Sequence, residues 1–138
     1  MNDTHKSASV SLDGYTIIAR KDRKTRQTKG GGVIAYAKST IEATNVQCPD
    51  PEEADVVFVS VLTMTGSHLI GGVYRPPHST VVESYVEECL PGLIAETTYL
   101  SVSLIGDFND HTIHGVYDMA RTLGMKQRIR GTTHIKGK

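Results

Sequence analysis

The feature that most restricts the fold is a pair of apolar stretches, ADVVFVSVLTM at residues 54–64 and HLIGGVYRP at residues 68–76. Three turn-forming residues, Thr65, Gly66 and Ser67, separate them, and this spacing predicts a β-hairpin. In the first stretch both alternating sets of positions are largely apolar, which indicates a strand that is buried on both faces. Such a strand requires covering structure on each side of its sheet.

Three more stretches predict strands. GYTIIARKD at residues 14–22 and GGVIAYAKS at residues 31–39 flank a basic loop and are expected to form a second hairpin. SVSLIGDF at residues 101–108 is expected to be a buried strand beside the strands at 54–64 and 68–76. MKQRI, near the end of the chain, gives a weaker signal for a last strand.

Two helices are also predicted. In residues 80–97 a capping-box pattern precedes apolar residues at helical spacing, and Pro91 is expected to kink or split that helix. The second helix spans residues 114–123 and is followed by Gly124 as a stop signal. Hairpins followed by strands that alternate with helices indicate one layered domain of the α/β (α+β) class.

The charge is balanced overall but uneven along the chain. Fifteen basic residues face fifteen acidic ones, whereas residues 20–29 hold six Lys or Arg side chains and one Asp. This stretch is either a solvated hairpin loop or a patch that contacts a polyanion, and Arg23 and Lys24 lie at its centre. The two cysteines, Cys48 and Cys89, are expected to be reduced.

No signal peptide is recognisable, and no apolar run reaches the ~20 residues of a membrane-spanning helix. We therefore expect an intracellular protein that makes no membrane contact.

The apolar run at residues 102–105 ends in Gly-Asp-Phe-Asn-Asp. Along an extended backbone Asp107 and Asn109 lie on the same side, where a carboxylate can hold a hard cation or a water molecule and an amide can bind a phosphoryl oxygen. The alternative is an Asx turn that closes the strand.

The strand at residues 68–76 also ends in polar side chains. Tyr74 and Arg75 offer a hydroxyl and a guanidinium that can meet phosphate oxygens, although an edge aromatic before a proline-stiffened turn has the same pattern. The six histidines do not form a metal-ligand set: His111 and His114 are three residues apart but have no third ligand nearby.

In order, GYTIIARKDRKTRQTKGGGVIAYAK, GGVYRPP, LIGDFND and LGMKQRIRGTTHIKG resemble the endonuclease/exonuclease/phosphatase superfamily. The similarity is greatest to the apurinic-type endonuclease domain of non-LTR retrotransposons, which precedes a reverse transcriptase in the parent polyprotein. Each motif is weak alone, but the four follow one another in the family's order over nearly the whole of residues 1–138.

The resemblance implies a four-layer sandwich of two β-sheets flanked by helices, with a Mg²⁺-dependent (or Mn²⁺-dependent) site that hydrolyses the phosphodiester backbone of DNA. On this pattern Asp107 binds the metal and activates the attacking water, Asn109 binds the scissile phosphate, and Tyr74 contacts phosphate. Thr133 matches a threonine near the substrate. The resemblance also implies a nuclear location.

This sequence departs from the family pattern at both ends. Asp3 stands where the family has a metal-binding Glu, and a shorter carboxylate fits octahedral magnesium less well. The closing Ser-Asp-His segment is absent. We therefore expect a single partial domain, incomplete at both termini, that cleaves DNA weakly or not at all.

Two other functions fit the same motifs. Phosphatases of this superfamily, which act on phosphorylated lipids or small molecules, share the Gly-Asp-x-Asn core. A non-catalytic remnant with at most a binding role would also keep these residues.

Overall fold

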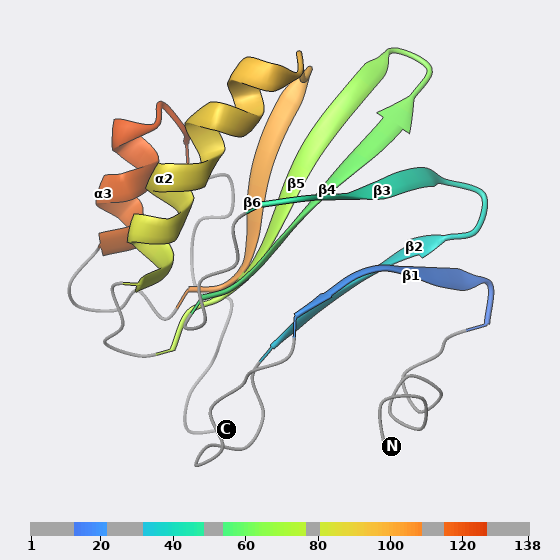
Figure 1. Ribbon diagram of the computed structural model, residues 1–138, viewed down its shortest axis with the longest axis horizontal. Coiled ribbons are helices and arrows are strands. Elements are labelled where there is room, and N and C mark those ends of the chain that lie inside the picture. Colours follow the sequence, from blue (N-terminus) through green and yellow to red (C-terminus); the bar gives the residue numbers. More distant parts are fainter. Residues whose placement is uncertain (1–12, 22–31, 49–53, 77–80, 109–114, 127–138) are drawn as a thin grey trace.

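The computed structural model describes residues 13–21, 32–48, 54–76, 81–108 and 115–126 (Figure 1). Its elements in chain order are β1 (Tyr15–Lys21), β2 (Val33–Lys38), β3 (Glu42–Val46), β4 (Asp55–Thr63), β5 (Gly66–Tyr74), α2 (Val81–Glu96), β6 (Ser101–Asp107) and α3 (Gly115–Thr122).

The strands form two sheets. β1 and β2 pair antiparallel as a separate hairpin, and the larger sheet has the order β3-β4-β5-β6. Both predicted hairpins are confirmed, with β4 and β5 paired from Asp55↔Tyr74 to Thr63↔Gly66. β6 runs parallel to β5, because helix α2 carries the chain back along the sheet between them.

The two faces of β4 belong to two different cores. Val56 and Phe58 pack under helix α2, whereas Val57 and Val59 pack against the β1–β2 hairpin. Figure 1 shows the helices on one side of the four-stranded sheet and the hairpin on the other. The protein is thus a mixed α/β fold with two sheets, and the prediction that β4 is covered on both faces is confirmed.

Residues 101–107 form a strand beside β5, as predicted, but the prediction that this strand is buried is wrong. Val102 and Leu104 pack against the helix-side core, while Ile105 on the opposite face is 58 % exposed. β6 is the last strand of the sheet in the described part of the chain, and the β1–β2 hairpin packs on β4 and β5. The outer face of β6 is therefore open.

Helix α2 matches its prediction, but it continues through Pro91 and is not split there. Proline removes the hydrogen bond to the carbonyl of Glu87, four residues earlier. Pro91 and Glu87 both lie on the exposed side of the helix, where water can donate a hydrogen bond to the Glu87 carbonyl.

Helix α3 also lies where it was predicted. Its Met119 is buried in the core, and Gly124 follows the helix with a φ of 78°. The amide of Met125 donates to the carbonyl of Ala120 at 2.8 Å, which closes the helix with a left-handed glycine.

Two segments differ from the sequence prediction. Strand β3, with the sequence EATNV, was not predicted, because it is mostly polar and exposed and owes its strand form to its pairing with β4. Of the weak strand predicted at residues 125–129, Met125 and Lys126 adopt no strand, and the rest lies outside the described residues.

Candidate active site

Tyr74 and Asp107 are direct register partners at the carboxyl ends of β5 and β6. Positions 74 and 107 are far apart in the chain, yet the parallel pairing places their side chains on the same face of the sheet. This is the face opposite the helices, since the alternate residues Val73 and Leu104 belong to the helix-side core. Asp107 is exposed and Tyr74 is half-buried. The two strand ends that the sequence singled out therefore meet.

Asp55 continues this row onto the next strand. It is the register partner of Tyr74 at the start of β4, so Asp55, Tyr74 and Asp107 lie side by side across three strands. Asp55 is only 2 % exposed. Sequence reasoning missed it, although counting outward from the β4–β5 turn would have placed it opposite Tyr74.

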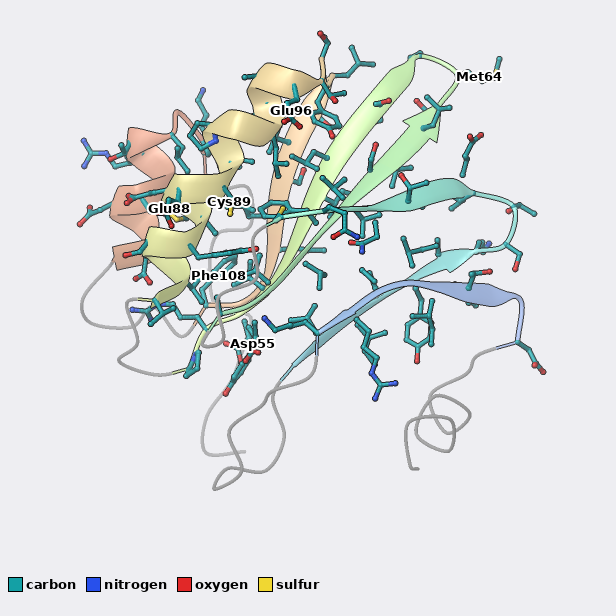
Figure 2. All side chains as sticks on the ribbon, viewed as in Figure 1. Asp55, Met64, Glu88, Cys89, Glu96 and Phe108 are labelled. Carbon is teal, nitrogen blue, oxygen red and sulfur yellow. The ribbon has the colours of Figure 1, made fainter. Side chains whose placement is uncertain are left out.

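The next residue of each strand turns toward the helices. Arg75 is 1 % exposed; its Nε donates to Glu83 Oε2 at 3.0 Å and its Nη1 to the carbonyl of Phe108 at 3.0 Å. The backbone amide of Arg75 donates to the carbonyl of Asp107 at 2.8 Å. The ring of Phe108 packs against the helix-side core. Figure 2 labels Phe108 and Asp55 at the same end of the sheet.

The inward position of Arg75 could have been found from the sequence. Val73 is an obvious core residue, and Arg75 lies two positions further along the same strand, so it shares the helix side. Glu83 is acidic and lies in the first turn of α2, which begins shortly after β5.

The basic stretch begins beside this end of the sheet. Lys21, the last residue of β1, donates from Nζ to the carbonyl of Ala54 at 2.8 Å, and Ala54 directly precedes Asp55. The last described residue of β1 therefore contacts the residue that directly precedes β4.

Five of the predicted site residues lie outside the described residues. They are Asp3, Arg23, Lys24, Asn109 and Thr133, and the same holds for His111 and His114.

Asp107 has the chemistry of a magnesium ligand. Mg²⁺ prefers oxygen donors and is usually held by one or two carboxylates together with water and phosphate oxygens. An exposed carboxylate at a strand end fits that requirement. Within the ranges given above, no group of three or more His, Cys, Asp or Glu side chains is arranged to hold a metal ion.

A separate hollow of about 140 Å³ lies between the ends of β1 and β3 and the start of β4. Arg20, Cys48 and Tyr85 are among the residues that line it, and Tyr74 and Asp107 are not. Burial and the neighbouring Cys89 thiol raise the pKa of Cys48 to about 11, although a hydrogen bond with Tyr85 acts to lower this pKa. Burial likewise raises the pKa of Cys89. These thiols are protonated at neutral pH and are poor nucleophiles.

A scan of protein-family models, a search of curated proteins and a search of solved structures found no match to this chain. Among the described helices, none is long and apolar enough to cross a membrane.

Proposed function

We propose that this chain is a metal-dependent phosphodiesterase domain of the retroelement endonuclease type, with weak activity on DNA. The observation that carries the proposal is the register pairing of Tyr74 with Asp107. The sequence motifs require a tyrosine and a carboxylate from separate strands to share one site, whereas an isolated Asx turn requires no such meeting.

In this proposal each residue acts at the phosphate or at the attacking water. Asp107 orients the water and accepts its proton, and the Tyr74 hydroxyl donates to a phosphate oxygen. Asn109 binds the scissile phosphate through its amide, and Thr133 lies near the substrate. A bound Mg²⁺ or Mn²⁺ would supply positive charge against the negative charge that develops on the phosphate.

The fold is compatible with the four-layer sandwich that we propose for the whole domain. The described residues supply a helical layer, the sheet of β3 to β6 and the β1–β2 hairpin of a second sheet. The exposed outer face of β6, with Ile105 at its centre, would then be covered by further strands of that second sheet.

DNA is the proposed substrate because of the basic stretch. Its first two residues, Arg20 and Lys21, end the strand that reaches Ala54, next to Asp55 in the site row. Arg23 and Lys24 follow within the same stretch and would contact phosphates along the backbone. A reverse transcriptase domain in a parent polyprotein and a nuclear location are parts of the same proposal.

The test is nicking of supercoiled plasmid by the purified chain in the presence of Mg²⁺, beside the Asp107→Asn and Asp118→Asn variants. Asp118 is exposed on helix α3, so its replacement makes the same chemical change away from the site. We expect slow nicking by the unaltered chain and by Asp118→Asn, and a loss of about a hundredfold in Asp107→Asn.

Three results would overturn the proposal. Nicking that survives in Asp107→Asn would mean that the activity arises elsewhere. Release of phosphate from a monoester without any nicking would identify a phosphatase. No nicking at high protein concentration with either Mg²⁺ or Mn²⁺ would identify a non-catalytic remnant.

A further inference from the structure

Arg75 joins three elements at the end of the sheet. Its backbone extends β5, its Nε bonds to Glu83 in the first turn of α2, and its Nη1 bonds to the backbone of Phe108 just beyond β6. A guanidinium suits such a junction, because its donors have a fixed planar geometry and can serve partners in different directions.

Glu83 is buried as well, with 9 % of its surface exposed. Oε2 accepts from Arg75 at 3.0 Å, while Oε1 is buried and has no hydrogen-bond partner among the described residues. Burying this pair costs desolvation energy that an apolar pair would avoid. Apolar packing therefore does not account for the presence of an ion pair at this position.

Two hydrogen bonds of Arg75 end on the backbone of Asp107 and of the residue that follows it. The Arg75 amide binds the carbonyl of Asp107 at 2.8 Å, and Nη1 binds the carbonyl of the following residue, Phe108, at 3.0 Å. The first bond restrains the peptide that follows Asp107, and the second restrains the peptide that follows Phe108. They therefore set where the Asp107 side chain lies relative to Tyr74 on β5.

We infer that Arg75 and Glu83 are positioning residues that hold Asp107 in register with Tyr74 and do not contact the substrate. This inference rests on the proposed function for its effect on rate, but the backbone restraint is independent of it. With 1 % of its surface exposed, Arg75 offers a phosphate little access. An internal role thus replaces the phosphate contact that the sequence suggested for this residue.

The first experiment measures amide hydrogen exchange by NMR in the unaltered chain, in Glu83→Gln and in Leu90→Ala. Leu90 is a core residue two turns further along α2, so its truncation weakens packing without touching the Arg75 contacts. In Glu83→Gln we expect the Arg75 amide, which binds Asp107, to exchange about tenfold faster, with the β4–β5 amides unchanged. Leu90→Ala should speed exchange across the whole sheet. Equal protection of the Arg75 amide in Glu83→Gln and the unaltered chain would overturn the inference.

The second experiment compares nicking kinetics of Arg75→Lys with the unaltered chain. Lysine keeps the positive charge but lacks the planar set of N–H donors that reaches both Glu83 and Phe108. A positioning role therefore predicts a fall in kcat of about a hundredfold with little change in KM. A substrate contact predicts a rise in KM with kcat largely kept, and this result would refute the inference. If the unaltered chain does not nick at all, the proposed function fails, while hydrogen exchange still decides the positioning role.

Discussion

Replacing Gly106 by alanine tests the close approach of β5 and β6 directly before the candidate site. Gly106 is the register partner of Val73 and precedes Asp107, and its φ is 145°. A Cβ at this position would overlap the carbonyl oxygen of Val73 and lie 2.8 Å from the carbonyl carbon. Because that carbonyl belongs to the backbone of the neighbouring strand, it cannot move away without disturbing the sheet.

The expected loss follows from two unfavourable effects and one favourable effect. A non-glycine residue at such a φ costs about 1–3 kcal/mol, and forcing an extra carbon into a packed site costs about as much again. Alanine recovers roughly 0.4–1 kcal/mol by restricting the unfolded chain. We therefore expect Gly106→Ala to lower the free energy of unfolding by about 1–6 kcal/mol, against the roughly 5–15 kcal/mol typical of a domain.

Gly92→Ala is the matched control. Gly92 is exposed on helix α2, and a Cβ there would meet nothing within 4 Å. Alanine favours the helix over glycine by roughly 0.5–1 kcal/mol, so this variant should be slightly more stable than the unaltered chain.

The assay is urea unfolding followed by far-UV circular dichroism, with the slope m compared between variants. Stability of Gly106→Ala within about 0.5 kcal/mol of the unaltered chain, with the control shifted as expected, would refute the register of β5 and β6.

Two further predictions concern the thiols and the basic stretch. Because the pKa of Cys48 is raised from 9.0 to about 11, iodoacetamide should modify Cys48 more slowly in the folded protein than in urea at pH 8, as measured by peptide mass spectrometry. A rate of Cys48 modification equal to that in urea would contradict its burial. Because the neutral thiol is favoured in the folded state, the contribution of Cys48 to stability should be lost as pH rises from 9 to 11. Retention on a DNA column should fall with added salt and fall further in Arg23→Ser/Lys24→Ser, but not in the control Lys38→Ser/Lys126→Ser; retention insensitive to salt would exclude backbone contacts.

Local patterns were sufficient for most of the fold. The two hairpins, helix α2 and helix α3 follow from apolar alternation, helical spacing and a stop glycine. Strand β3 could not be predicted, since its residues are polar and only pairing with β4 makes them a strand. The burial of β6 was misjudged because an apolar run shows what a strand could bury, not whether another layer reaches it.

Sequence reasoning named Tyr74 and Asp107 of the candidate site, but it missed Asp55 and the inward direction of Arg75. The family resemblance implies that Tyr74, Asp107 and Asn109 share one site. The strand register brings Tyr74 and Asp107 together, and Asn109 lies outside the described residues. The inward direction of Arg75 and the place of Asp55 depend on register and on alternation along three strands. The register and the alternation of side chains can be counted once the hairpin turn is known, but no single sequence motif predicts them.

The parallel pairing of β5 with β6 has a consequence for the order of folding. β4 and β5 are joined by a tight turn, whereas every β5–β6 pair, from His68↔Ser101 to Tyr74↔Asp107, joins positions 33 apart. Closing a loop of that length costs about 3 kcal/mol of chain entropy before the contacts form. Hairpins form in about 1–10 μs, and non-local pairings are slower. We therefore expect the β4–β5 hairpin to form early and to act as the template on which β6 docks. Tyr74 would then be in place before Asp107 arrives, so the candidate site would be among the last parts of the sheet to be completed.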